Sequence, residues 1–482
     1  MKEESPLFTD FYSLTMAQGY WKNGMNRRAV FEMFFRKHPF NGGFSLFAGL
    51  GTLLKRLCEI RFAEDDLEFL SEQKVFEKGF LDYLKDFRFT GNVWAFEEGS
   101  VIFPNEPLIR VEGNFIECQI IEGMLLNIIN FQSLVATKTA RVYLASKKGN
   151  LFEFGLRRAQ GPDGALSASR AAYIGGAMGT SNVKAARVFN IPAFGTMAHS
   201  WIMAFPNEEE AFRAYADIYP DRSIFLIDTY NTLKNGIINA VKVGKELAAK
   251  GKKFGVRLDS GDIHYLSVEV RRILDEAGLT MAEISVSNDL DEYIIQTLTA
   301  AGAPIDSWGV GTQMVTGGRE GAFPGVYKLA AIENEKSELN AVMKFSDNPE
   351  KTSNPGVKQV WRISDQENLF AADILALDDE EKSDTIEKGN TYTFWHPSAD
   401  YRHFSMSVNG NAAPLLVKKL DKGVLTEKAP PLEKVRAYAQ NQLDMLDQSY
   451  KRLLNPHVYK VSATAKLRSL KLGLIENYLG ST

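Results

Sequence analysis

The chain has 482 residues, which is too long for one ordinary domain, so two or three domains are expected. Its formal net charge of −4, without a basic stripe, argues against a nucleic-acid-binding protein, and no apolar run is long enough to span a membrane. The acidic start lacks the apolar segment of a secretory signal, and two cysteines are too few for a disulfide framework, so a cytoplasmic protein is expected.

The first 125 residues have the pattern of a domain with an antiparallel sheet. Short, partly alternating apolar segments occur at 28–37 and 93–117, and glycines and prolines separate them, as tight turns require. A helical pattern follows from about Ile116 to Lys147, with apolar residues at spacings of three and four. This helix is expected to lead into the first strand of the next domain.

The middle of the chain carries short apolar runs, and amphipathic helices are expected between them at 235–253, 262–278 and 289–302. Each run is too short for a helix and rich in branched and aromatic residues, as in strands buried on both faces. Four of the runs start roughly 30 residues apart, the length of one strand–helix unit. The runs are LFEFG (151–155), IPAFGTMAHS (191–200), SIFLIDTY (223–230), KFGVRLDSGD (253–262), ISVSNDL (284–290) and SWGVGTQM (307–314). They predict a β/α barrel, whose active site lies at the carboxyl ends of the strands.

After residue 340 the pattern becomes less regular. A polar loop at 346–356 and a charge-rich segment at 377–390 precede a helical pattern at 430–479. Strands within 359–420 are expected to join the N-terminal sheet. The expected domains are an N-terminal α/β (α+β) domain at 1–125, a catalytic β/α barrel at 126–345 and a partly helical C-terminal region at 346–482.

His199 follows one of the expected strands and a Gly-Thr turn, in the segment GTMAHSW. A lone histidine is more often structural, and the histidine spacings are not those of a zinc site. A position at the carboxyl end of a strand nevertheless favours a functional role. Thr196 can present a hydroxyl and a backbone N–H to the same cavity.

Arg257 and Asp259 occupy alternate positions in VRLDSGD, so both side chains point to the same face of a strand. The two could form a structural salt bridge, or Arg257 could hold an anion while Asp259 orients a cation or a hydroxyl. Asp228 occupies an equivalent strand end, and Asn288 and Asp289 occupy another. Carboxylates in these places suit ribose hydroxyls or Mg²⁺, which prefers oxygen ligands and keeps its waters.

A glycine-rich turn and a group of cations are candidates for binding phosphate. GVGTQMVTGG (309–318) is neither a dinucleotide fingerprint nor a Walker loop, and a simple tight turn is an equal alternative. Gly311 and Thr312 lie where barrels commonly bind phosphate through backbone N–H groups. The cations could form an exposed charged face, but their place beside apolar strands favours contact with a polyanion. They are Lys138, Arg141, Arg157, Arg158 and Arg170.

Six motifs follow one another in order over roughly residues 9–320. They are TDFYSLTMAQGYW (9–21), EFGLRRAQGPDGA (153–165), GTMAHSW (195–201), VRLDSGD (256–262), VSNDLDE (286–292) and GVGT (309–312). Together they closely resemble the nicotinate phosphoribosyltransferase family. The resemblance implies a type II phosphoribosyltransferase fold, in which an N-terminal α/β domain packs on an irregular β/α barrel. No motif is recognised beyond residue 340, so the C-terminal region stays unassigned.

The resemblance implies an ATP-dependent enzyme of NAD biosynthesis by salvage. Nicotinate and 5-phosphoribosyl-1-diphosphate would give nicotinate mononucleotide and diphosphate, coupled to hydrolysis of ATP to ADP and phosphate, with Mg²⁺ present. Its partners would be these small molecules, with no nucleic acid and no membrane. Related enzymes often build the active site across a dimer interface, so a homodimer with a shared site is expected.

The resemblance also assigns roles to single residues. His199 resembles the histidine that ATP phosphorylates, and Asp259 and Asp228 are the catalytic carboxylates and the alternative ligands of Mg²⁺. The expected nicotinate-binding positions, the first of them supplied by a neighbouring subunit, are Tyr12, Thr196 and Arg257. The expected positions for phosphoribosyl diphosphate are Arg141, Lys138, Arg157, Asn288, Asp289, Gly311 and Thr312.

Two rival functions share much of this pattern. Nicotinamide phosphoribosyltransferase is a relative with similar site motifs, but an anionic substrate requires cations such as Arg257 and Arg157, and the EFGLRRA block favours nicotinate. A catalytically silent barrel that senses nucleotides would bind phosphoribosyl diphosphate without releasing diphosphate.

Two acidic features are expected to have structural roles only. Asp262 begins a helix and is expected to be its N-cap. The segment ILALDDEEKSDT (374–385) superficially resembles the acidic motif of type I phosphoribosyltransferases, but no phosphate loop follows it. Asp378 and Asp379 are therefore expected on a solvated edge.

Overall fold

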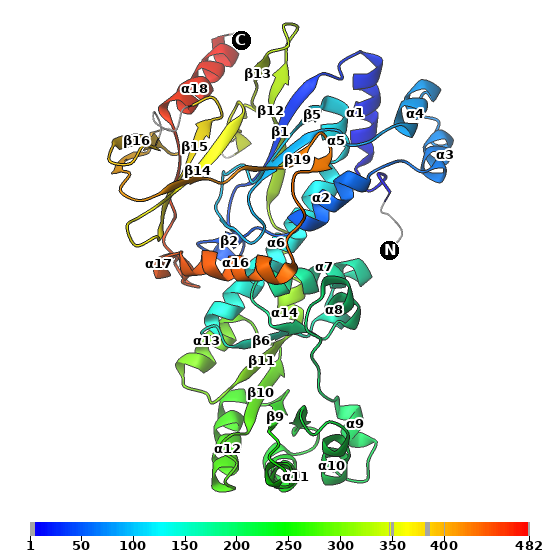
Figure 1. Cartoon of the computed structure of the whole chain (residues 1–482), viewed down its shortest axis with the longest axis vertical. Helices are drawn as coiled ribbons and strands as arrows, with labels where there is room; N and C mark the ends of the chain where they lie inside the picture. Colours follow the sequence, from blue (N-terminus) through cyan, green and yellow to red (C-terminus); the bar gives the residue numbers. More distant parts are fainter. Residues whose placement is uncertain (1–4, 347, 349–350, 381–385, 400, 481–482) are drawn as a thin grey trace. The chain divides into compact units, whose positions relative to one another are not determined.

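The computed structural model describes residues 5–346, 348, 351–380, 386–399 and 401–480 (Figure 1). The chain divides into two compact units, one formed by residues 1–134 and 322–482 and the other by residues 135–321. We call them the first and the second unit. Parts of the polar loop expected at 346–356 and of the charge-rich segment expected at 377–390 lie outside the described residues.

The second unit is built on a six-stranded parallel sheet with the strand order β7-β6-β11-β10-β9-β8. Its strands are β6 (Asn150–Glu153), β7 (Gly179–Thr180), β8 (Ser223–Leu226), β9 (Phe254–Leu258), β10 (Glu283–Asn288) and β11 (Ser307–Val310). Short strands of apolar residues, buried on both faces, are typical of parallel sheets covered by helices. The expected α/β class with a parallel sheet is therefore confirmed, and β7 and β8 form the two edges of this sheet.

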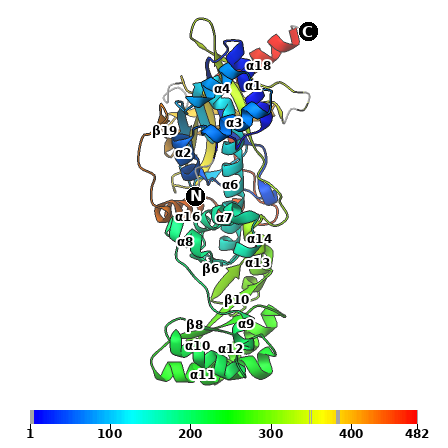
Figure 2. The ribbon, with the colours of Figure 1, turned by 90° about the vertical axis from the view of Figure 1, so that its right-hand side faces the viewer.

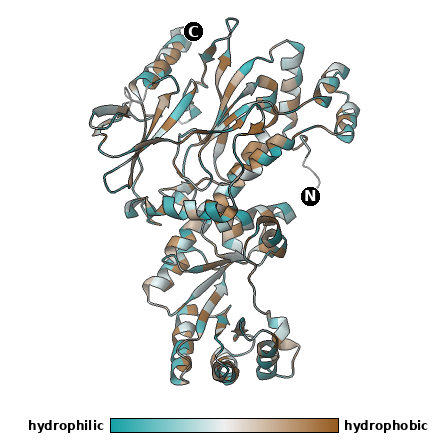
Figure 3. Cartoon of the chain, viewed as in Figure 1, coloured by the Kyte–Doolittle hydropathy of each residue, from teal (hydrophilic) through white to brown (hydrophobic). Residues whose placement is uncertain are grey.

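Helices connect these strands and cover the sheet. They are α6 (Glu122–Ala145), whose second half belongs to this unit, η2 (Leu156–Arg158), α7 (Gly161–Ile174), α8 (Val183–Phe189), α9 (His199–Met203), α10 (Glu208–Ile218), η3 (Thr232–Gly236), α11 (Ile237–Ala249), α12 (Ile263–Glu276), α13 (Glu292–Ala300) and α14 (Thr312–Val315). Helices α10, α11 and α12 lie side by side (Figure 2). Along α12, hydrophobic and hydrophilic residues alternate (Figure 3), and Ile263, Val270 and Leu274 are its buried apolar positions.

The apolar runs predicted five of these strands correctly, and the prediction for 191–200 was wrong. In that segment Ala193 forms a single parallel bridge with Thr180, and His199 begins α9 instead of following a regular strand. Strand β7, which pairs with β6, is too short to produce a recognisable pattern. The expected helices at 235–253, 262–278 and 289–302 are present as α11, α12 and α13.

The first unit contains an antiparallel sheet with the order β13-β12-β1-β5-β3-β19-β20. Its strands are β1 (Arg28–Phe35), β3 (Asn92–Ala95), β5 (Ile109–Asn114), β12 (Gly325–Glu333), β13 (Leu339–Ala341), β19 (Val417–Asp421) and β20 (Val424–Leu425), and a further pair is β2 (Ser45–Leu46) with β4 (Val101–Ile102). The helices of its N-terminal part are α1 (Phe11–Lys22), η1 (Pro39–Asn41), α2 (Leu50–Glu59), α3 (Glu64–Glu72), α4 (Lys78–Lys85) and α5 (Phe115–Ile120). Apolar residues of the sheet and of α1, α2 and α4, among them Met33, Leu14, Leu53 and Phe80, form one buried core.

A second sheet of this unit has the order β17-β16-β21-β15-β14-β18. Its strands are β14 (Lys358–Ser364), β15 (Phe370–Leu377), β16 (Thr391–Trp395), β17 (His403–Ser407), β18 (Ala412–Pro414) and β21 (Val461–Ala463). The expectation that strands within 359–420 join the N-terminal sheet was therefore wrong for β14 to β18, which form this separate sheet with β21; β19 does pair with β3 of the N-terminal sheet. The helical pattern expected at 430–479 is interrupted, because β21, buried and parallel to β15, separates α16 (Leu432–Asp444) and α17 (Gln448–Lys451) from α18 (Ala465–Gly480).

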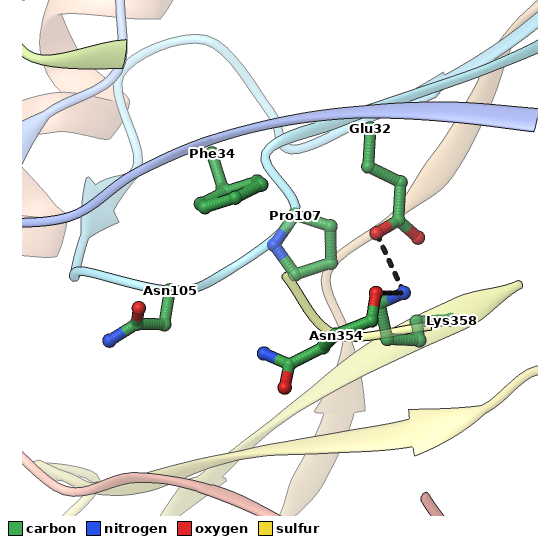
Figure 4. A pocket seen from close by; sticks show the side chains of 6 residues that line it. All are labelled: Glu32, Phe34, Asn105, Pro107, Asn354 and Lys358. Carbon is green, nitrogen blue, oxygen red and sulfur yellow. Dashed lines mark hydrogen bonds and ion pairs between the residues drawn. The ribbon is translucent and has the colours of Figure 1, made fainter. Parts of the chain in front are cut away.

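Lys358 joins the two sheets of the first unit. Its ammonium group pairs with Glu32 of β1 at 2.9 Å and donates to the backbone carbonyls of residues 354–356 (Figure 4). A cavity of about 10 Å³ beside this pair is large enough for one water molecule at most. Arg110 donates to the Lys358 carbonyl and also pairs with Asp378 at 3.1 Å. Asp378, which was expected on a solvated edge, therefore also has a structural contact.

Candidate active site

Polar residues at the carboxyl ends of three neighbouring strands of the second unit are hydrogen-bonded to one another. The Asp259 N–H donates to Asp228 Oδ2 at 2.9 Å, and the Ser260 hydroxyl donates to the same oxygen at 2.6 Å. The Ser287 hydroxyl donates to Asp259 Oδ1. Residues from the ends of β8, β9 and β10 therefore meet at one edge of the sheet, as parallel strand direction requires.

Arg257 lies on β9, on the same side as Asp259, and its guanidinium group is largely desolvated. It donates to the Thr196 hydroxyl and, at 2.8 Å, to the Met197 carbonyl. Burial lowers the pKa of Arg257, the charges of Asp259 and Asp228 oppose this shift, and the positive charge of Arg157 adds to it. Its Nε is buried and has no hydrogen-bond partner among the described residues. An anion beside Arg257 would satisfy this donor.

In the described structure, Asp228 has an unpaired hydrogen-bond acceptor, whereas Arg257 has an unpaired donor. Its Oδ2 accepts two hydrogen bonds, but its Oδ1 is buried and has no partner in the described part of the chain. An acceptor oxygen of this kind fits a sugar hydroxyl or a hard cation. The described residues contain no group of three or more His, Cys, Asp or Glu arranged around a metal position. A Mg²⁺ ion here would have to combine the carboxylates of Asp228 and Asp259 with water and substrate oxygens.

His199 lies beside the same carboxylates. Its Nδ1 is 3.1 Å from the Thr229 hydroxyl, and its Nε2 is 3.7 Å from Asp259 Oδ2. The side chain is 41% exposed, so the ring contacts both the carboxylate cluster and solvent. The hydroxyl of Thr229 orients the ring through Nδ1, and Nε2 is the nitrogen on the side of Asp259.

The expected phosphate-binding residues fall into three groups. Lys138 and Arg141 on α6 are buried, and both form ion pairs with the buried Glu292 at the start of α13. Gly311 is the N-cap of the short helix α14, which Thr312 begins. The expected residues on the surface are Arg157, Asn288 and Asp289.

Tyr12 belongs to the first unit, where it lies on α1 and is 49% exposed. The hydrogen bonds described above therefore link Arg257 to Thr196 and, separately, Asp259 to Asp228, with His199 beside the carboxylates, but they do not include Tyr12. Asp262 accepts a hydrogen bond from the Tyr265 N–H, so its expected role as the N-cap of α12 is confirmed.

Two residues near these strand ends were assigned no role from the sequence. Glu153, at the end of β6, is buried and accepts hydrogen bonds from Ser169 at 2.8 Å, from Thr180 at 2.5 Å and from the Gly155 N–H. The signal that could have identified it is a single acid within an apolar strand. Glu292 gave no such signal, because the cations that it binds lie about 150 residues away in the sequence.

Comparisons with known proteins agree over nearly the whole chain. The profile described as the nicotinate phosphoribosyltransferase (NAPRTase) family matches residues 150–373, and the profiles of its N-terminal and C-terminal domains match residues 7–130 and 357–471. The nicotinate phosphoribosyltransferase of Bacillus subtilis is 41% identical over 97% of this chain and 94% of its own length. The chain belongs to the nicotinate phosphoribosyltransferase family.

More distant proteins also align with this chain over nearly its whole length. The nicotinate phosphoribosyltransferase of Homo sapiens is 33% identical and covers 96% of each chain. The crystal structure of human nicotinic acid phosphoribosyltransferase matches with a TM-score of 0.83 at 30% identity, over 97% of this chain and 99% of the human one. A structure of nicotinate-nucleotide pyrophosphorylase from Pyrococcus furiosus has the same fold, with a TM-score of 0.69 at 23% identity.

Family membership confirms the resemblance that the six motifs indicated, and the chain is an enzyme. It also extends the resemblance, because the C-terminal domain profile covers a region in which no motif was recognised. Among the described residues, no helix combines the length and apolar character needed to cross a membrane.

Proposed function

We propose that this chain is a nicotinate phosphoribosyltransferase of NAD salvage that joins nicotinate to the ribosyl carbon of 5-phosphoribosyl-1-diphosphate. The products are nicotinate mononucleotide and diphosphate, and ATP is hydrolysed to ADP and phosphate. The observation that carries the proposal is the placement of Arg257 within the electrostatic reach of Asp228 and Asp259 at neighbouring strand ends, in a chain of this family.

Nicotinate differs from nicotinamide by its negative charge, and Arg257 is the residue suited to recognise that charge. Its buried Nε lacks a partner in the described structure, and Thr196 already holds the far side of the guanidinium group. A carboxylate would receive a charge-assisted hydrogen bond there, whereas an amide would not balance the positive charge. Tyr12 of a neighbouring subunit would complete this pocket in a homodimer, and Arg157 would add positive charge.

The chemical step needs little acid–base help, because the pyridine nitrogen is already a nucleophile. It attacks the ribosyl carbon as the bond from that carbon to diphosphate breaks, so positive charge develops on the sugar and negative charge on the leaving group. Asp228 and Asp259 would hold the ribose hydroxyls and stabilise the positive charge. If Mg²⁺ is bound by these carboxylates, it neutralises part of the diphosphate charge.

Phosphate groups require donors and positive charge. The N–H groups of Gly311 and Thr312 begin α14, and Lys138 and Arg141 supply cations on α6. Asn288 and Asp289, at the end of β10, would bind the ribose end of the same substrate. In this proposal the parallel sheet corresponds to the irregular barrel of the type II fold, in a cytoplasmic enzyme.

His199 is the proposed acceptor of the γ-phosphoryl group of ATP. Its Nε2 would attack phosphorus as the bond to the bridging oxygen breaks, giving ADP and a phosphohistidine, and water would later release phosphate. Nε2 is favoured because Nδ1 is engaged by Thr229. By analogy with other phosphorylated side chains, the added charge of about −1.5 to −2 would reorganise nearby cations and change substrate affinity.

The test is a diphosphate-release assay with nicotinate, nicotinamide or quinolinate, each with and without ATP. We expect release with nicotinate, stimulation by ATP, and loss of that stimulation in His199→Ala. The control is His403→Ala, an exposed position on β17 of the first unit, which should keep the stimulation. Preference for nicotinamide would support the rival transferase, binding without diphosphate release would support the silent sensor, and full ATP stimulation in His199→Ala would exclude the phosphohistidine.

A further inference from the structure

Glu292 holds two cations that come from another helix of the second unit. Its Oε2 lies 2.6 Å from Lys138 Nζ, and its Oε1 accepts a hydrogen bond from Arg141 Nε at 2.9 Å. The three side chains are 0%, 5% and 1% exposed. One buried carboxylate therefore neutralises charge on both cations and fixes their positions.

One of the two cations, Lys138, lies against the glycine-rich turn. The Gly318 backbone has a φ of +61°, and a Cβ on this residue would lie 3.2 Å from Lys138 Nζ. The turn that follows α14 thus approaches the ammonium group as closely as a glycine permits. Arg141 is fixed at its other end, where its Nη2 donates to the Tyr293 hydroxyl at 3.2 Å.

The charge state of Glu292 follows from these contacts. Burial raises the pKa of Glu292, but the charge and hydrogen bond of Lys138, together with the charge of Arg141, outweigh burial and lower the pKa overall. The carboxylate is therefore ionised at neutral pH and remains a permanent negative charge beside the proposed phosphate-binding cations.

A simple structural ion pair would explain the burial but would give no reason for its place beside the turn. We propose that Glu292 is a positioning residue, an internal anion that holds Lys138 at the glycine-rich turn, fixes Arg141 beside it on α6, and competes with the phosphate groups of the substrate for the charge of both cations. The inference rests on the proposed function, in which these two cations bind phosphoribosyl diphosphate. It predicts an unusual effect, because removing Glu292 should tighten the binding of an anionic ligand while destabilising the empty protein.

The first experiment compares the full-length wild type with Glu292→Gln, using inorganic diphosphate as the probe. We expect a lower melting temperature without ligand, a larger diphosphate-induced rise in melting temperature, and a Kd for diphosphate lower by about tenfold in calorimetry. The matched control is Asp373→Asn in the first unit, which removes the carboxylate partner of the buried Arg362. This control should also lower the melting temperature, but diphosphate should stabilise it no more than it stabilises the wild type.

A second comparison covers the case in which Glu292→Gln does not fold. Lys138→Gln removes one cation, and the double variant Lys138→Gln/Glu292→Gln removes one charge of each sign, so the buried net charge stays as in the wild type. The double variant should bind diphosphate more tightly than Lys138→Gln alone.

The outcomes separate the inference from the proposed function. Wild-type protein that does not bind diphosphate, or Lys138→Gln that binds it as tightly as the wild type, contradicts the assignment of these cations to phosphate. Binding in the wild type, weakened by Lys138→Gln but not tightened by either Glu292 substitution, overturns the inference and leaves that assignment intact.

Discussion

Two buried polar side-chain atoms at the strand ends of the second unit have no hydrogen-bond partner among the described residues. A buried donor or acceptor without a hydrogen bond costs about 1–3 kcal/mol. In the described structure Arg257 Nε and Asp228 Oδ1 are such atoms, one a donor and the other an acceptor. Under the proposed function, a substrate that carries a carboxylate and sugar hydroxyls would satisfy both atoms.

A different residue-scale feature lies in the first unit, where two acids share one arginine. Glu106, in the segment between β4 and β5, is buried close to Asp373, and Asp373 forms a bidentate pair with Arg362. The Glu106 Oε2 accepts from the Phe103 N–H at 2.9 Å, and the Tyr459 hydroxyl donates to Asp373. Burial, followed by the charge of Asp373, holds the pKa of Glu106 well above its ordinary value. Glu106 therefore carries a proton in the folded protein at pH values where the unfolded chain has lost it.

This proton makes stability depend on pH in a definite direction. Because the folded pKa is raised, the stability contributed by Glu106 is fully present below the unfolded pKa of about 4.3 and is lost as the pH rises through the folded pKa. Gln mimics the protonated acid. The free energy of unfolding of Glu106→Gln should therefore rise relative to that of the wild type by up to about 1.4 kcal/mol per pH unit above pH 5. Urea unfolding at several pH values between 5 and 8 measures the difference.

The matched control for Glu106 is Glu246→Gln. Arg213 lowers the pKa of the Glu246 carboxyl, so the contribution of Glu246 to stability is lost only as the pH falls. The difference in unfolding free energy between Glu246→Gln and the wild type should therefore stay constant above pH 5. A difference for Glu106→Gln that is equally flat would mean that Glu106 is ionised in the folded state.

At the scale of elements, the site depends on how closely helices approach the strand ends. The turn from β8 into η3 and α11 is the tightest of these places, because a Cβ on Gly236 would overlap the carbonyl oxygen of Ile227. Ile227 precedes Asp228, so the backbone that Gly236 contacts also carries a proposed catalytic carboxylate. A rigid backbone atom cannot move aside as a flexible side chain can.

Gly236→Ala should therefore destabilise the protein by about 3 kcal/mol and lower activity by shifting Asp228. Denaturant unfolding gives the stability, and the diphosphate-release assay gives the activity. Gly473→Ala on α18 is the control, because a Cβ there meets nothing within 4 Å, and we expect it to stabilise by up to about 1 kcal/mol. A Gly236→Ala protein as stable and active as the wild type would show that the close contact between Gly236 and the Ile227 backbone is not required.

On the scale of the whole molecule, every residue proposed to contact ligand lies in the second unit, except Tyr12. The first unit contributes two sheets and their cores, joined through buried ion pairs such as that between Lys358 and Glu32. A ligand that binds at the strand ends should therefore stabilise the two parts of the chain unequally.

Hydrogen exchange of the full-length protein with and without diphosphate tests this distribution. At a diphosphate concentration of about 100 times Kd, exchange through local opening should slow by up to about 100-fold near the site. The protected segments should include 228–231, 259–262, 288–291 and 311–318, whereas 358–377 in the first unit should change little. Protection confined to 358–377 would place the anion site elsewhere.

The sequence alone determined those features that are encoded locally. Apolar runs predicted five strands of the parallel sheet, the periodic segments predicted α11, α12 and α13, and Asp262 was identified as a cap, because each depends on residues near one another in the chain. The motifs around His199 and Arg257 also indicated the family correctly, since each is a short, contiguous segment.

Only the tertiary structure decided which distant residues meet. The pairing of Glu292 with Lys138, the proximity of Glu106 and Asp373, and the insertion of β21 beside β15 join segments separated by about 80 to 270 residues. Strands β7 and β21 are two and three residues long, too short to carry a period of their own. A local pattern specifies which face of an element is apolar, but the partner of a buried charge or a short strand is set by the packing of whole elements, and no local spacing encodes it.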